Sequence, residues 1–183
     1  FDDVLSEDMP FGDIRSFYAY IDPNNEKSLW MSENFGFEKA AEIATQSFSR
    51  IRLPKRTAVE KIDDWHLVSA VIRNHFAKDA FYFEDHLKKG PYFVIRDASG
   101  TIQACAKITT AKWAIDRLPG KIGGWLPKII PFIPGLRKII RPKNHTFLVP
   151  EAVFVANDDP KILVQLFEGM LALENQHLIL WWV

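Results

Sequence analysis

The chain has 183 residues, enough for one ordinary domain, and its 23 basic and 23 acidic side chains leave no net charge. Hydrophobic residues make up 48% of it and aromatic residues 13%, which supplies a packed core and excludes a disordered chain. Balanced charge gives no overall argument for nucleic acid or an anionic membrane, and a single cysteine excludes an internal disulfide and a cysteine-rich zinc site.

The first third of the chain predicts a strand, a helix and a second strand. Residues 1–14 are acidic and rich in turn formers, so we expect an irregular lead-in, and the aromatic run RSFYAYI (15–21) predicts a short strand. The stretch DPNNEKSLWMSENFGF then predicts a helix that ends at Gly36, because glycine is common just after a helix. Alternating residues over 42–53 predict the next strand.

A boundary at PKRTA (54–58) precedes a second series of elements. AVEKI predicts a strand, and residues 63–78 predict a helix capped by Asp63 or Asp64. FYFEDHLKKG (81–90) predicts a shorter helical piece. PYFVIRD and TIQACAKITTA predict two strands of a hairpin, because the short segment ASG between them contains glycine.

Residues 113–145 interrupt this pattern with a basic, proline-rich insert. Six of the eleven prolines lie between Pro119 and Pro150, and residues 121–143 contain six basic residues and no acidic one. The prolines predict short pieces rather than one long amphipathic helix. We expect the apolar side of the insert to pack on its own or a neighbouring domain, in preference to contact with a membrane surface.

The last part of the chain predicts a strand, a helix and a strand. The run HTFLVPEAVFVA predicts a strand, and residues 157–176 predict a helix with Asp158 or Asp159 as its cap and Pro160 in its first turn. HLILWWV predicts a buried final strand. Because the chain begins at Phe1 and ends in this apolar run, we expect it to be a piece of a longer polypeptide.

The order of these elements after residue 56 resembles the front part of a GNAT-type N-acyltransferase domain, and residues 15–53 resemble the back part. The family often carries N-x-x-[AS]-x-x-[hydrophobic]-Y-x-x-x-G-F at its last helix. This chain matches that pattern except at the tyrosine, and the residues at those offsets are Asn25, Ser28, Met31, Ser32, Gly36 and Phe37.

The resemblance implies an α/β (α+β) fold with a mixed, mostly antiparallel sheet flanked by helices. Residues 1–55 would be the C-terminal part of one GNAT-like domain, and residues 56–183 the N-terminal part of a second, degenerate one that carries the insert at 113–145. Alternatively, the two parts contain every element of one such domain in permuted order, and the first strands could pack beside HLILWWV in a single sheet. The sequence does not choose between these arrangements.

The resemblance also implies acyl transfer, in particular acetyl transfer, from coenzyme A to an amine. Asn25 and Ser28 would then contact the cofactor, acetyl-CoA, near a helix N-terminus that suits anionic groups. Ser32 stands where the family often has a tyrosine that protonates the leaving thiolate, and a serine hydroxyl is a far weaker acid. Glu151 stands where the family often has its general base. Each of these residues can instead have a purely structural role.

One departure from the family bears directly on cofactor binding. The phosphate-binding loop [RQ]-x-x-G-x-[GA] should follow EAVFVA, but the chain has NDDPKI there, with no glycine, two carboxylates and a proline that removes an N–H donor. We therefore expect residues 56–183 to be a non-catalytic supporting domain that does not bind coenzyme A in the standard way. The alternative for the whole chain is a non-catalytic GNAT-like module for binding or assembly.

The remaining expectations concern partners and compartment. The partners implied are a small-molecule or protein amine and a second GNAT-like unit, in the same chain or in a homodimer, and no nucleic acid. The five histidines are scattered without the spacing of metal ligands, so we expect no metal site. A lone cysteine and the lack of a signal sequence predict a reducing, cytoplasmic compartment.

Overall fold

The computed structural model describes residues 19–79, 82, 84–117, 120 and 123–182. The chain divides into two compact units, Phe1–Ile43 and Ala44–Val183.

The first unit contains the predicted helix, α1 (Glu26–Asn34). Asn25 caps it, because its side-chain oxygen accepts a hydrogen bond from the backbone N–H of Ser28 at 3.2 Å. The chain leaves the helix through Gly36 at φ +78°, a conformation that glycine adopts without strain. None of the residues of α1 is buried.

The strand predicted over residues 15–21 is wrong in its described part. Residues 15–18 lie outside the described residues, and residues 19–21 are not in a strand. The side chain of Tyr20 is largely exposed, and 19–21 join no ladder in the described sheet. An aromatic run forms a strand only where another strand supplies the backbone hydrogen bonds.

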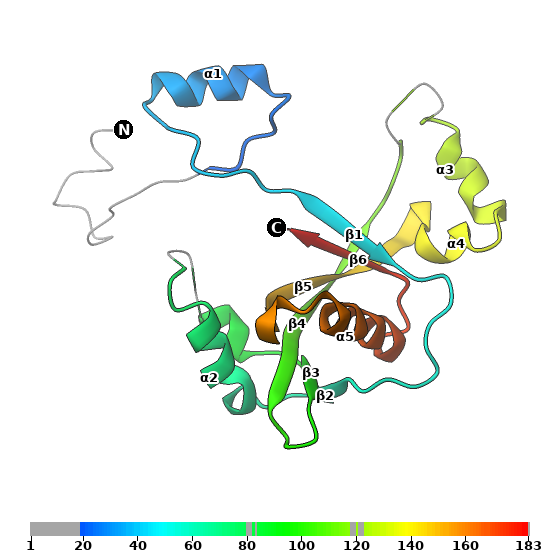
Figure 1. Cartoon of the computed structure of the whole chain (residues 1–183). Helices are drawn as coiled ribbons and strands as arrows, with labels where there is room; N and C mark the ends of the chain where they lie inside the picture. Colours follow the sequence, from blue (N-terminus) through cyan, green and yellow to red (C-terminus); the bar gives the residue numbers. More distant parts are fainter. Residues whose placement is uncertain (1–18, 80–81, 83, 118–119, 121–122, 183) are drawn as a thin grey trace. The chain divides into compact units, whose positions relative to one another are not determined.

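The second unit is built on a six-stranded sheet with the strand order β1-β6-β5-β4-β3-β2 (Figure 1). Every neighbouring pair is antiparallel except β5 and β6, which run parallel. The fold is therefore a mixed α/β one with a mostly antiparallel sheet flanked by helices, as predicted. The strands are β1 (Thr45–Ser49), β2 (Glu60–Ile62), β3 (Tyr92–Arg96), β4 (Ile102–Trp113), β5 (His145–Val155) and β6 (Leu178–Trp182).

Local sequence signals locate most of these elements. The hairpin of β3 and β4 forms where it was predicted, and Asp97 closes its turn by accepting from the N–H groups of Ser99 and Thr101, both at 2.9 Å. Two strands are shorter than predicted: the 42–53 strand is reduced to β1 and the AVEKI strand to β2. β1 extends only as far as β6 lies opposite it, whereas β2 begins at Glu60, opposite Val94, although β3 continues to Arg96.

The edge strand β1 pairs with β6 along its whole length, from Thr45 opposite Trp182 to Ser49 opposite Leu178. β1 precedes the PKRTA boundary, whereas β6 ends the described chain. The two strands nevertheless belong to one sheet within the unit Ala44–Val183.

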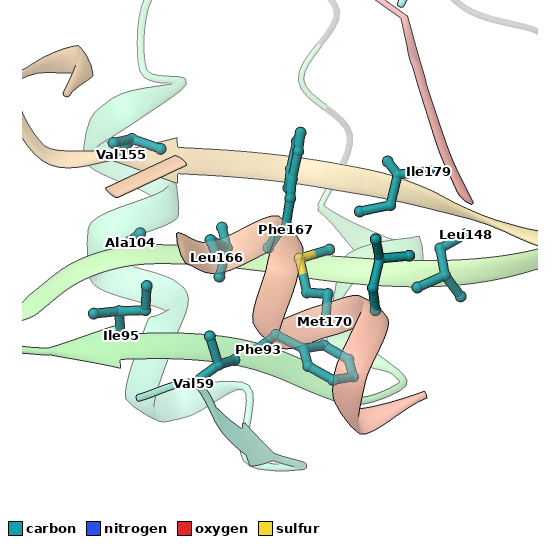
Figure 2. Packing of buried hydrophobic residues seen from close by; sticks show 12 residues of the cluster. Val59, Phe93, Ile95, Ala104, Leu148, Val155, Leu166, Phe167, Met170 and Ile179 are labelled. Carbon is teal, nitrogen blue, oxygen red and sulfur yellow. The ribbon is translucent and has the colours of Figure 1, made fainter. Parts of the chain in front are cut away.

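The helix α5 (Pro160–Leu173) connects the parallel strands β5 and β6 and covers one face of the sheet (Figure 1). Its apolar stripe packs on alternate residues of the strands, including Phe93 and Ile95 of β3. Figure 2 shows Leu166, Phe167 and Met170 pointing from α5 toward these strands. Gly169 allows α5 to approach the segment before β2 closely, because a Cβ there would collide with Val59 and Thr57.

The opposite face is covered by α2 (His66–His75) and the short 3-10 helix η2 (Asp85–Lys88). Val68 and Ile72 of α2 pack with Tyr92, Val94 and other residues of the sheet, and Leu87 brings η2 into the same cluster. The helix predicted over 63–78 is thus present but shorter, and Asp64 accepts the N–H of His66 at 2.9 Å at its start. Residues 80, 81 and 83 lie outside the described residues.

The insert forms short pieces, as its prolines predict. They are α3 (Leu126–Ile129), η3 (Ile130–Phe132), α4 (Leu136–Ile139) and η4 (Pro142–Asn144). The ends of β4 and β5 pair as far as Trp113 opposite His145, and the N–H of Ile115 then donates to the carbonyl of Pro142 at 2.8 Å. Across the described part of the chain, no helix combines the length and the apolar character that spanning a membrane requires.

Candidate functional site

The N-terminus of α5 lies where the resemblance places a phosphate-binding loop. The turn before it is η5 (Ala156–Asp158), in which Asn157 and Asp158 have positive φ values of 56° and 52°. Asp159 then caps the helix, because its carboxylate accepts the N–H of Lys161 at 2.8 Å.

This cap leaves little for an anionic ligand to bind. Pro160 has no N–H to donate, and the next N–H, that of Lys161, is already taken by Asp159. A phosphate group would also meet the negative charge of that carboxylate. At the start of α5 one N–H donor is therefore absent and the next is taken by the chain itself, as at a plain acidic cap.

Glu151 lies at an irregular point in the ladder between β4 and β5. Cys105 pairs with Phe154 and Lys107 with Glu151, so β5 carries one residue more than β4 between these two pairs. Such an extra residue is a β-bulge. Ala152 has φ +49° in this bulge.

The carboxylate of Glu151 accepts hydrogen bonds from two side chains and lies near a third. Lys107, directly opposite on β4, donates from Nζ to Oε2 at 3.2 Å, and the hydroxyl of Thr109 donates to Oε1 at 2.5 Å. The ring nitrogen Nε2 of His86, in η2, lies 3.9 Å from Oε2. Lys107 also donates to the backbone carbonyl of His86 at 2.7 Å. The cluster therefore ties β4, β5 and η2 together.

The geometry of this cluster decides what Glu151 can do. Its side chain is 28% exposed, whereas that of Lys107 is only 11% exposed. A general base must reach the proton that it removes, and both oxygens of Glu151 already accept a hydrogen bond from the protein. The arrangement is typical of a structural role, in which Glu151 connects neighbouring elements. Glu151 can act as a base only if a substrate displaces one of these donors.

The three other predicted site residues lie together on α1. Asn25 caps the helix through the N–H of Ser28, and the hydroxyl of Ser32 donates to the backbone carbonyl of Ser28 at 2.8 Å. Each of these contacts is one that a helix makes for itself. α1 belongs to the first unit and Glu151 to the second, so the structure brings Asn25, Ser28 and Ser32 together without relating them to Glu151.

Sequence reasoning missed His86, Lys107 and Thr109 as partners of Glu151. One signal was available: Lys107 and Thr109 are two residues apart in a strand, so they share a face. The register that places this face against Glu151 depends on the bulge, which has no sequence signature here. The proximity of His86 depends on how η2 packs on the sheet.

The single cysteine is not part of a reactive site. Cys105 is buried between the sheet and α2. Burial raises the pKa of its thiol to about 12, which suppresses the nucleophilic thiolate at neutral pH. Among the described residues, no three His, Cys, Asp or Glu side chains gather in a group that could hold a metal ion.

An open apolar pocket of about 130 Å³ lies between the β1–β6 edge of the sheet and α5. Its lining includes Phe48, Phe167 and Trp181, and the ring of Phe167 contacts those of the other two edge to face. No charged side chain lines it, and its polar lining residues are Gln46 and Ser47.

Comparisons with protein-family models, with curated proteins and with solved structures give no match. The resemblance to the GNAT family thus rests on the residues and the element order alone.

Proposed function

We propose that residues 44–183 form a non-catalytic GNAT-like module that supports an amine-acylating protein without binding acetyl-CoA itself. The observation that carries this proposal is the self-capped N-terminus of α5. Asp159 occupies the N–H of Lys161, and Pro160 removes another donor where a pyrophosphate would be held. In the full protein, a neighbouring GNAT-like unit would bind the cofactor and a small-molecule or protein amine.

The pairing of β1 with β6 favours a structural, non-catalytic role for residues 44–183. An element that precedes the PKRTA boundary completes the sheet, so the unit joins both sides of that boundary. A GNAT-like module of this kind holds its neighbours in place and requires no catalytic residue of its own. A reducing, cytoplasmic compartment belongs to the same proposal.

A second candidate is an acyl-CoA-dependent N-acetyltransferase in which Glu151 is the general base. One observation favours it: β5 and β6 pair at a single position, Leu148 with Ile179, so the parallel strands part beyond it. Beyond this position the backbone groups of β5 are not paired with β6 and would be available to a pantetheine arm. Glu151 lies on β5 beyond Leu148 and keeps partial access to solvent.

Titration calorimetry with acetyl-CoA separates the two candidates. The module predicts no saturable heat, which corresponds to a Kd weaker than about 1 mM. The enzyme predicts saturable binding by this chain, and release of free coenzyme A when simple primary amines are added. If binding is seen, Glu151→Gln should lower the acetylation rate by about 10²- to 10⁴-fold without weakening acetyl-CoA binding.

Matched variants locate any binding that is seen. Asn25→Ala tests the cofactor role implied for the first turn of α1, and Ser32→Ala tests the replaced tyrosine position. The module predicts that neither variant changes the heat of titration. Saturable binding that Asn25→Ala abolishes would place the cofactor beside α1, in the first unit, whereas saturable binding that Asn25→Ala leaves unchanged would contradict the module.

A further inference from the structure

The insert presents an apolar surface that the protein does not cover. We call residues 123–144 the insert lobe. Phe132 is 82% exposed and Trp125 is 48% exposed, and Ile129 and Ile133 next to them are also exposed. Ile129 ends α3 and Phe132 ends the following 3-10 turn η3, three residues further on, so these two side chains share one face, and the exposed Ile133 follows directly.

The same lobe carries only positive charge. Lys128, Arg137, Lys138, Arg141 and Lys143 are all exposed, and among the described residues none of them forms an ion pair. The sequence contains no acidic residue between positions 121 and 143. The insert lobe therefore has a basic surface although the whole chain has no net charge.

The lobe is packed where it meets the sheet. Ile130 and Pro127 are buried, and Ile139 packs against the cluster of Phe147, Val149 and Leu178. The N–H of Ile115 donates to the carbonyl of Pro142 and closes the base of the lobe. Because the inward residues are anchored, the exposed apolar residues form a fixed outward face rather than an unpacked loop.

We propose that the insert lobe docks on the surface of an anionic lipid bilayer. Phe132, Ile129 and Trp125 enter the boundary between headgroups and acyl chains, and the lysines and arginines meet the anionic headgroups. Amphipathic basic segments with exposed aromatic and aliphatic residues bind membranes in this way. The sequence alone favoured packing of this apolar side on protein, and the exposure of Phe132 and Trp125 is what leads to the membrane instead.

The composition of the face favours lipid over the other occupants. Nucleic acid is bound through phosphate contacts and aromatic stacking, and the isoleucines of this face serve neither purpose. A second copy of the lobe would bring like charges together without a compensating acidic residue. An anionic bilayer matches both the apolar and the basic character.

Co-sedimentation of the full chain with vesicles tests the proposal. We expect binding to phosphatidylcholine vesicles that contain about 30% phosphatidylserine, little binding to pure phosphatidylcholine, and weaker binding as salt is raised. Phe132→Ser should lower partitioning about tenfold or more. Arg137→Gln with Lys138→Gln should lower it about 25-fold, because each basic residue near the surface contributes about fivefold.

Matched controls separate the lobe from general effects. Trp30→Ser removes an exposed aromatic side chain of α1, and Lys78→Gln with Lys89→Gln removes two exposed charges outside the lobe. We expect both controls to bind as the unchanged chain does. All four variants alter exposed side chains, so circular dichroism should show an unchanged melting temperature.

Several results would overturn the proposal. Absence of binding to the anionic vesicles is one, and equal loss of binding in the lobe and control variants is another. Binding of a single-stranded oligonucleotide without binding of vesicles would identify a nucleic-acid surface. Self-association that Phe132→Ser abolishes, again without vesicle binding, would identify a contact between copies.

Discussion

Glu151 of β5 and Lys107 of β4 stand directly opposite each other, and the ammonium of Lys107 bonds both the Glu151 carboxylate at 3.2 Å and the His86 carbonyl at 2.7 Å. Lys107 is the more buried of the two partners, with 11% of its side chain exposed. One side chain therefore joins two strands and the 3-10 helix η2 at the bulge.

Replacing Lys107 by methionine should destabilise the fold by about 1–3 kcal/mol, because the half-buried Glu151 and the His86 carbonyl lose their donor. Chemical denaturation measures this free energy of unfolding. Lys88→Met is the control, because the Lys88–Asp85 pair is exposed and screened by solvent, and its effect should be much smaller. If the two substitutions lowered the free energy of unfolding equally, the hydrogen bonds of Lys107 would not stabilise the fold as we expect.

Gly169 is a tight contact between α5 and the segment that precedes β2. Gly169→Ala places a Cβ against Val59 and Thr57, so it should cost about 1–3 kcal/mol despite the better helix propensity of alanine. Gly124→Ala is the matched control, because a Cβ there meets no atom within 4 Å. Thermal unfolding of both variants tests the packing, and a Gly169→Ala protein as stable as the control would contradict it.

His145 makes the stability of the second unit depend on pH. It is buried beside Phe147, its Nδ1 has no hydrogen-bond partner among the described residues, and desolvation lowers its pKa below the ordinary 6.5. Below pH 6.5 the unfolded chain therefore binds a proton that the folded chain does not. Stability is full above pH 6.5 and falls as the pH drops toward the folded pKa.

The difference between the unchanged chain and His145→Gln isolates this effect. The unchanged chain should lose more stability than the variant between neutral pH and about pH 5, the range in which an ordinary histidine takes up its proton. Urea unfolding at a series of pH values measures the two curves. Parallel curves would show that His145 titrates normally in the folded state.

Cys105 should be protected from thiol reagents. Its burial and the raised pKa, about 12, predict very slow reaction with Ellman's reagent in the native protein. In denaturant the same thiol should react at the rate of an ordinary cysteine. Rapid labelling of the native protein would mean that the packing between β4 and α2 opens readily.

Local signals in the sequence predicted most elements of the fold. Asn25 before α1, Asp159 and Pro160 at the start of α5, and the short turn between β3 and β4 each act within a few residues. Such signals depend on backbone geometry and capping, which a short stretch of sequence determines by itself. The self-capped start of α5 was therefore predicted as well.

The relationships that the sequence did not predict are between distant residues. The pairing of TQSFS with the final strand was one of two arrangements that the sequence left open, because several strands could supply the same backbone hydrogen bonds. The cluster around Glu151 requires the bulge near Ala152 and the packing of η2, which follow from the whole sheet. The exposed face of the insert lobe was not predicted either, because the pattern of isoleucines and prolines does not indicate which side faces solvent.

The central claim is that the α5 N-terminus is occupied by the chain and does not hold an acyl-CoA phosphate. The backbone amide of Lys161 reports on this directly, because it is the donor that Asp159 takes. An NMR titration with coenzyme A should leave the Lys161 amide signal unmoved at ligand concentrations up to about 1 mM. A saturable shift of this signal would contradict the account and place a phosphate site at α5.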